Sequence, residues 1–139
     1  MEKQPSWYGL NMLPICDEVL ERQLNTSIDQ YANLCEVTDK PHVLDKDIVS
    51  RIIKSHSQQN EDVWVYFEQC QKWRSLSPSA EEIKLINQVE KNAAKLERIN
   101  KNIIDLASQI MGKTIDSVVS AKDFDFGLDW LLKTFSKND

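Results

Sequence analysis

The sequence is poor in the residues that build tight turns. It contains only three Gly and four Pro among 139 residues, below the roughly 7% and 5% of an average protein. Turn-rich β-architectures and glycine-rich phosphate-binding loops need many such residues, because their turns require positive φ angles or the fixed φ of proline. The scarcity therefore favours an all-α protein.

Cysteine and long apolar runs are scarce as well. Cys16, Cys35 and Cys70 are odd in number and widely spaced, which is typical of reduced intracellular thiols rather than of a disulfide framework. No stretch approaches the 18 apolar residues of a membrane span, and the first residues lack the basic and apolar regions of a signal peptide. We therefore expect a cytoplasmic protein that has no contact with a membrane.

Positive charge is in deficit. Lys and Arg number 17 against 22 Asp and Glu, for a net charge of −5, so bulk attraction to nucleic acid is not expected. Apolar residues make up 41% and charged residues 28%, as in ordinary soluble globular proteins. The length fits a single helical domain, residues 1–139, in which residues 1–12 show no periodicity and form an extended N-terminal arm.

Most of the chain shows the three- and four-residue spacing of apolar positions that predicts helices. We expect helices over 14–37, 42–56, 60–75, 79–111, 115–121 and from Asp123 to about 135. The segment 63–67 is rich in β-formers and has a short strand as its alternative, but Asn60 is a good N-cap and favours helix. Ser79 and Glu82 match a capping box, and Gly112 is expected to end the long helix in a left-handed conformation.

The fold class predicted is therefore all-α, a helical bundle of five or six helices built around one long helix. That helix, about 79–111, carries a heptad pattern of apolar residues broken by one asparagine: Leu85, Val89, Asn92, Leu96, Ile99, Ile103, Leu106 and Ile110. At 1.5 Å per residue it spans about 50 Å, whereas a compact globule of this size is about 37 Å wide. The helix must overhang the body, bend, or find a partner of similar length.

Self-association along this heptad seam is the expected remedy, which makes a homodimer the expected oligomer. The residues expected in the dimer seam are Val89, Leu96, Ile99, Ile103, Leu106 and Ile110. Whether the seam packs within one chain or between two is left open by the sequence.

Two groups of side chains are candidate partner-binding residues. Lys84, Lys91, Lys95 and Arg98 fall within about 60° of one another on the long helix. This basic stripe either meets phosphates or an acidic partner, or flanks a coiled-coil seam and pairs with neighbouring glutamates. The second group is aromatic: Trp64, Tyr66 and Trp73 share the third helix, where Trp64 or Tyr66 is expected to look outward unless the helix is enclosed on two sides.

No pattern supports catalysis, a cofactor or a metal. Residues 107–114 match a relaxed phosphate-loop pattern, but a helix precedes them, so its negative end would face the phosphates. Asp125–Gly127 spells the metal-binding triplet of kinases, but the chain has no glycine-rich loop, no catalytic His-Arg-Asp and no room for a kinase domain. The acids around Gly127 do not have the spacing of a calcium loop. His42 and His56 lie about 21 Å apart along one helix and cannot share a metal, so each is expected at the surface or at a helix end.

These observations favour a non-enzymatic protein–protein interaction module: an adaptor, a regulator or a small acidic chaperone that holds a partner helix on apolar helical surfaces. The alternative is a nucleic-acid-associated regulator that uses the basic stripe of the long helix. An enzyme is the third and least supported reading.

Overall fold

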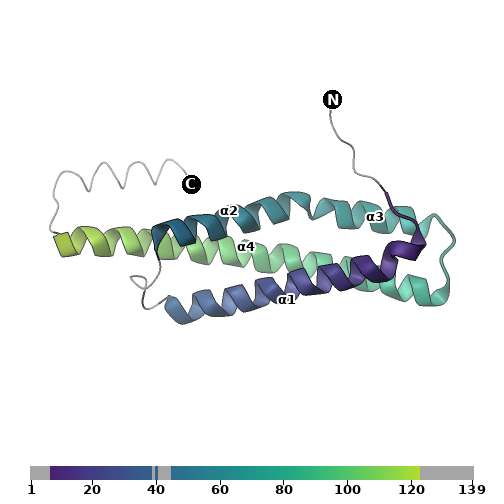
Figure 1. Cartoon of the computed structure of the whole chain (residues 1–139), viewed down its shortest axis with the longest axis horizontal. Helices are drawn as coiled ribbons and strands as arrows, with labels where there is room; N and C mark the ends of the chain where they lie inside the picture. Colours follow the sequence, from purple (N-terminus) through teal and green to yellow (C-terminus); the bar gives the residue numbers. More distant parts are fainter. Residues whose placement is uncertain (1–6, 39, 41–44, 123–139) are drawn as a thin grey trace, which may run out of the picture.

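The computed structural model describes residues 7–38, 40 and 45–122, which are helical apart from short connections (Figure 1). They form a 3-10 turn, η1 (Leu10–Met12), and four α-helices: α1 (Leu13–Val37), α2 (Lys46–Asp62), α3 (Trp64–Arg74) and α4 (Ala80–Lys122). No strand occurs in this part of the chain, so the all-α class is confirmed. A count of five or six helices is not confirmed, and the helix expected from Asp123 onward lies outside the described residues.

α1 occupies the range that the apolar spacing predicts. Pro14 lies in its first turn, where the missing N–H removes no intrahelical hydrogen bond. The helix ends at Val37, and the Thr38 hydroxyl after it donates to the carbonyl oxygen of Leu34 at 2.9 Å. One stripe of the helix is buried: Leu13, Leu20, Leu24, Ser27 and Leu34.

The boundary between α2 and α3 differs from the prediction. α2 begins after Asp45, whose carboxylate caps it by accepting from the Asp47 amide at 2.8 Å. It then continues through Asn60, so the prediction that Asn60 starts the third helix was wrong. The Asn60 side chain does not cap a helix but donates to the Glu97 carbonyl oxygen of α4 at 3.1 Å. Val63 alone separates α2 from α3, and the 63–67 segment is helical rather than a strand.

α4 starts where predicted and ends later than predicted. The capping box is present: the Ser79 amide donates to Glu82 Oε1 at 2.9 Å, and the Glu82 amide donates to Ser79 Oγ at 3.1 Å. The helix has 43 residues, about 65 Å in length. Gly112 has no positive φ and does not end it, so that prediction was wrong, and residues 115–121 continue α4 rather than form a separate helix.

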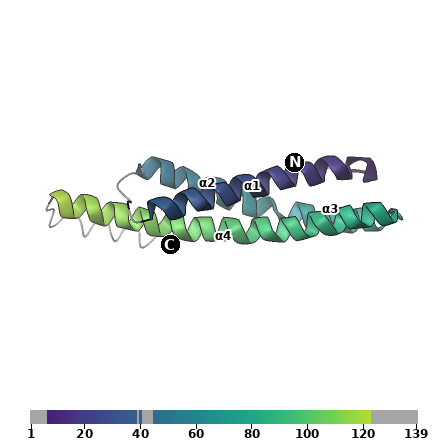
Figure 2. The ribbon, with the colours of Figure 1, turned by 90° about the horizontal axis from the view of Figure 1, so that it is seen from below.

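The helices form three rods (Figures 1 and 2). α1 and α4 run parallel, since Asp17 accepts from Gln88 near the start of both, and Ser27 donates to Asn100 further along both. α2 and α3 lie end to end as the third rod, which runs in the opposite direction. α4 packs against both other rods and extends beyond the ends of α1 and α2 (Figure 1). Overhang, one of the three outcomes left open for the long helix, is therefore present.

The buried positions of α4 keep the predicted heptad spacing but differ in phase. They step by three and four residues through Ile86, Val89, Ala93, Leu96, Asn100, Ile103, Ala107 and Ile110. Half of these are the predicted ones. At the other half, the buried residue is the one immediately after the predicted residue. The predicted residues are therefore only half-buried, at the edge of the buried stripe: Leu85, Asn92, Ile99 and Leu106. The stripe is wide because α4 has a rod on each side, and Ala93 and Ala107 allow those rods to approach closely.

The predicted dimer seam lies largely inside the single chain. Val89, Leu96, Ile103 and Ile110 are fully buried, while Ile99 and Leu106 are half-buried against the same core clusters. In this arrangement α1 and the α2–α3 rod cover the seam that a second chain was expected to cover. A dimer formed through these residues would require the bundle to open.

Candidate functional site

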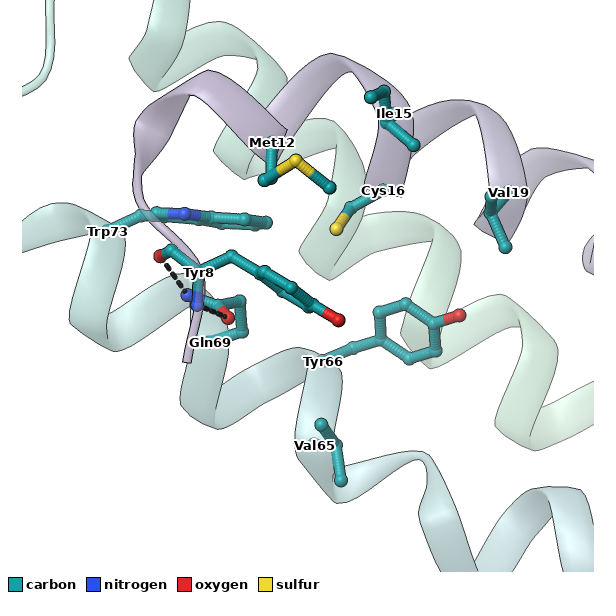
Figure 3. Close-up of a pocket in the computed structure, with 9 residues that line it drawn as sticks. All are labelled: Tyr8, Met12, Ile15, Cys16, Val19, Val65, Tyr66, Gln69 and Trp73. Carbon is teal, nitrogen blue, oxygen red and sulfur yellow. Dashed lines mark hydrogen bonds between the residues drawn. The ribbon is translucent and has the colours of Figure 1, made fainter. Parts of the chain in front are cut away.

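The N-terminal residues of the described chain are docked on α3. Gln69, which is buried, holds the backbone of Tyr8 from both sides: it accepts from the Tyr8 amide at 2.8 Å and donates to the Tyr8 carbonyl oxygen at 3.0 Å (Figure 3). The Trp73 indole N–H donates to the Gly9 carbonyl oxygen at 3.0 Å. These three hydrogen bonds fix residues 8 and 9 across the helix, and the chain then turns through η1 into α1.

The docked arm, α1 and α3 form the walls of a groove, which we call the apolar groove (Figure 3). Its volume is about 330 Å³, and Figure 3 shows the nine residues that line it: Tyr8, Met12, Ile15, Cys16, Val19, Val65, Tyr66, Gln69 and Trp73. Ile15 keeps 52% of its surface exposed and Val19 keeps 42%. Aliphatic side chains of this size are seldom left so exposed along a groove unless something covers them.

The titratable groups around the apolar groove are held in their neutral forms. Burial raises the pKa of the Cys16 thiol. Burial, and second the neighbouring Cys16, raise the pKa of the Tyr66 phenol, whose hydroxyl donates to Gln23 Oε1 at 2.9 Å. Burial and then the charge of Glu90 raise the pKa of Cys70, behind the groove, to about 12, although Arg74 opposes the change. A thiol held protonated is a poor nucleophile and packs as a small apolar group.

The three predicted aromatic residues have different environments. Trp64 is 50% exposed on the outer face of α3, and Tyr66 is half-buried in the apolar groove. Trp73 is only 1% exposed and belongs to the core. α1, the arm and α4 enclose most of its surface, although it also lines the apolar groove, and its role as a partner contact stays a prediction. The spacing of these residues in the sequence did not reveal which of the three side chains is buried.

Trp7 adds an aromatic surface that the sequence had not singled out as a site. Its ring meets Trp64 edge-on, with centroids 6.4 Å apart, and the Lys72 ammonium lies 5.0 Å from its centroid. Trp7 and Trp64 are both exposed on this surface, whereas the exposed side chains of Tyr8, Ile15 and Val19 line the apolar groove.

A polar groove continues the apolar one along α1. It has a volume of about 400 Å³ and lies between α1 and α2, and Val19 lines both grooves. The rest of its lining is mostly polar: Arg22, Gln23, Thr26, Ser27, Gln30, Ser55, His56 and Gln59. Together the two grooves form one long cleft beside α1, apolar toward α3 and polar toward α2.

At the base of the polar groove a buried layer of polar side chains joins all three rods. Asn100 of α4 is fully buried, and its Oδ1 accepts from Ser27 at 2.9 Å and lies 2.8 Å from His56 Nδ1. Its Nδ2 donates to Gln59 at 2.6 Å and to Asn60 at 3.1 Å. The prediction that His56 lies at the surface was wrong. The prediction for His42 falls outside the described residues.

The basic stripe is placed on the solvent face of α4. Lys84, Lys91, Lys95 and Arg98 are all exposed, about 180° around the helix from the buried Ala93. Within the described residues the two ion pairs are Arg22 with Glu18 and Arg74 with Glu90, so none of these four cations is paired with a carboxylate. Lys95 and Arg98 border a shallow groove between α1 and α4.

Neither a metal site nor a membrane span is found in the part of the chain that the structure describes. No three His, Cys, Asp or Glu side chains there are grouped as metal ligands would be. No described helix combines the length and the apolar character that crossing a membrane requires.

Comparison of the chain with protein-family models, with curated proteins and with solved structures found no match in any of the three. The fold and the clefts described above therefore carry the functional argument.

Proposed function

We propose that this chain is a non-enzymatic protein–protein interaction module, of the adaptor, regulator or small-chaperone kind, and that the long cleft beside α1 is its binding surface. The observation that carries the proposal is the exposed apolar surface at the α3 end of that cleft. Tyr8, Ile15 and Val19 each expose more than two fifths of their surface there. Clustered apolar and aromatic side chains beside a groove are typical of protein-binding sites.

The shape of the cleft fits a helix as its occupant. Along α1 the cleft runs from Met12 to Gln30, about 27 Å or five helical turns. It lies between antiparallel rods, α1 on one side and α2–α3 on the other, and a third helix packs well into such a valley. The apolar half would receive side chains spaced as i, i+3, i+4 and i+7, and the polar half would receive polar ones.

The arm makes this surface possible. Without the hydrogen bonds from Gln69 and Trp73, residues 7–9 would leave α3, and the apolar groove would lose Tyr8 as one wall. A groove with a fixed wall costs a partner less ordering entropy than a groove that must first form.

The first test is site-specific photo-crosslinking in the source cell. A benzoylphenylalanine at position 15 should crosslink to a partner protein through the apolar groove, whereas the same group at exposed Ile83 of α4, which lines neither groove, should not. The crosslinked segment of the partner is then made as a peptide and titrated against the purified chain. We expect a helical peptide, with a rise in helical circular dichroism on binding.

The matched variants are Ile15→Asp, on the cleft, and Ile83→Asp, away from it; the two side chains are 52% and 40% exposed, so neither change reaches the core. A carboxylate in the groove should weaken peptide binding by at least about 30-fold, about 2 kcal/mol, because the charge must be desolvated. Equal affinity of the two variants, or identical crosslinks from both positions, would refute the proposal.

A further inference from the structure

α1 and α4 carry opposite charges along the face that they share. The α1 range Leu13–Val37 contains five carboxylates and one basic residue, Arg22, and Arg22 is paired with Glu18. Glu21, Asp29 and Glu36 are exposed and fall within about 80° of one another around the helix. The solvent face of the neighbouring α4 is the basic stripe. The bundle therefore has an acidic ridge beside a basic one.

The two ridges overlap in height along the bundle. The hydrogen bonds between Asp17 and Gln88 and between Ser27 and Asn100 show that a residue of α1 lies level with the α4 residue 71 to 73 positions later. Glu21 is thus level with the interval from Lys91 to Lys95, and Asp29 is level with residues 100–102, within about one turn of Arg98.

A shallow apolar groove runs between the ridges. Its volume is about 330 Å³, and it is lined by Leu24 and Ile28 of α1 and by Lys95, Arg98, Ile99 and Asn102 of α4. Ile28 is 46% exposed. It lies seven residues from Glu21, and therefore on the same side of α1. The face thus has an apolar centre with charged borders, the usual arrangement of a protein interface.

We propose that this α1/α4 face binds a second copy of the chain, around a two-fold axis parallel to the rods. Rotation about such an axis keeps the rods parallel and at the same height, and exchanges the two sides of the face. The acidic ridge of each copy then lies on the basic stripe of the other, and the two Ile28 side chains meet near the axis. This interface goes beyond the proposed function and does not use the cleft, and of the predicted seam residues only Ile99 lines its groove.

The size of the face is adequate for a weak dimer. α1 has 25 residues, about 37 Å in length, and two packed helices are about 20 Å wide. The product, about 700 Å² for each copy, is slightly below the roughly 800 Å² of a standard specific interface. Because exposed charges border it, association should weaken as salt screens them.

A nucleic acid fits this face less well than a second copy does. A polyanion lying along the stripe from Lys91 to Arg98 would also meet the carboxylates of Glu21 and Asp29 on the neighbouring ridge, and like charges oppose binding. A second copy brings both signs of charge and satisfies both ridges at once.

The test exchanges the charges of the two ridges. One variant, Glu21→Lys/Asp29→Lys/Glu36→Lys, makes the face predominantly basic; the other, Lys91→Glu/Lys95→Glu/Arg98→Glu, makes it predominantly acidic. In sedimentation equilibrium at about 50 mM salt, the wild-type chain should dimerise, with a dissociation constant at least about 10-fold weaker at 500 mM. Each variant alone should be monomeric, and an equimolar mixture of the two should form a heterodimer.

The control reverses charge at Arg51 and Lys54, both exposed on α2, and should leave dimerisation unchanged. Circular dichroism confirms that each variant is folded. A wild-type chain that stays monomeric at about 100 μM and low salt would overturn the proposal, as would a mixture that fails to associate. Tight, salt-dependent binding of a DNA or RNA duplex by that monomer would instead assign the basic stripe to nucleic acid.

Discussion

Asn100 is the residue on which the three rods converge. It accepts and donates hydrogen bonds to side chains of α1 and α2 while it is fully enclosed on α4. On either side of it the core is apolar, with one cluster around Trp73 and the other around Val49. The partners of the buried Asn100 amide come from two other helices, so all of its hydrogen bonds form in only one relative register of the three rods. A shift of one rod by a helical turn would leave the donors of this amide unsatisfied.

Asn100→Ala should therefore lower the free energy of unfolding by about 2–4 kcal/mol, because Ser27, His56 and Gln59 would lose a buried partner and a small cavity would remain. Urea denaturation followed by circular dichroism measures the change. The matched control is Asn102→Ala, the same substitution at an exposed position of the same helix, for which we expect less than about 0.5 kcal/mol. Equal effects of the two substitutions would show that the polar layer does not stabilise the bundle.

Sequence patterns identified the type of residue in the α4 core but not every position. Two heptad patterns fit the apolar stripe of α4, one that includes Asn92 and one that includes Asn100. The stripe is wide enough for both because it contains adjacent pairs such as Leu85 and Ile86. The choice depends on the side from which α1 and the α2–α3 rod approach, and no local pattern carries that information. For the same reason His56 was expected at the surface, although the partner that it needs is Asn100, 44 residues away in the chain.

At the scale of helices, starts were easier to predict than ends. The Ser79 capping box is a local exchange of hydrogen bonds, so the sequence contains all of it. Asn60 has the residue type of an N-cap, but its amide bonds to α4 instead, and α2 runs on to Asp62. Gly112 permits a left-handed end without requiring one, and the helix continues because glycine costs it only about 1 kcal/mol.

Gly112→Ala should consequently stabilise the chain by about 0.5–1 kcal/mol, because alanine loses less backbone entropy than glycine on entering a helix. Apart from the neighbouring backbone of α4 itself, no atom lies within 4 Å of the position that the added Cβ would occupy, so no steric cost opposes the gain. Thermal unfolding should show a higher midpoint for the variant. Were Gly112 instead a left-handed cap, alanine there would be strained and the midpoint would fall.

The whole molecule is an elongated bundle rather than a globule, and the length of α4 is the reason. A helix of 43 residues cannot fit within a body about 37 Å across, so the shorter rods line up along it. α2 and α3 have 17 and 11 residues, and each is much shorter than α4. They cover most of its length only because they lie end to end. The same arrangement produces the long cleft on one side of α1 and the two charged ridges on its other side.

This shape predicts the scattering of the monomer. A rod about 65 Å long and 20 Å wide has a radius of gyration of about 20 Å, whereas a compact protein of 139 residues has one of about 14 Å. Small-angle X-ray scattering at about 500 mM salt, where the α1/α4 face is screened, should return the larger value together with the skewed distance distribution of a rod. Asn102→Pro, in the middle of α4, would break that helix and should change the distribution. A value near 14 Å for the unmodified chain would mean that α4 folds back on itself in solution, and neither the cleft nor the charged face would then have the length that its partner requires.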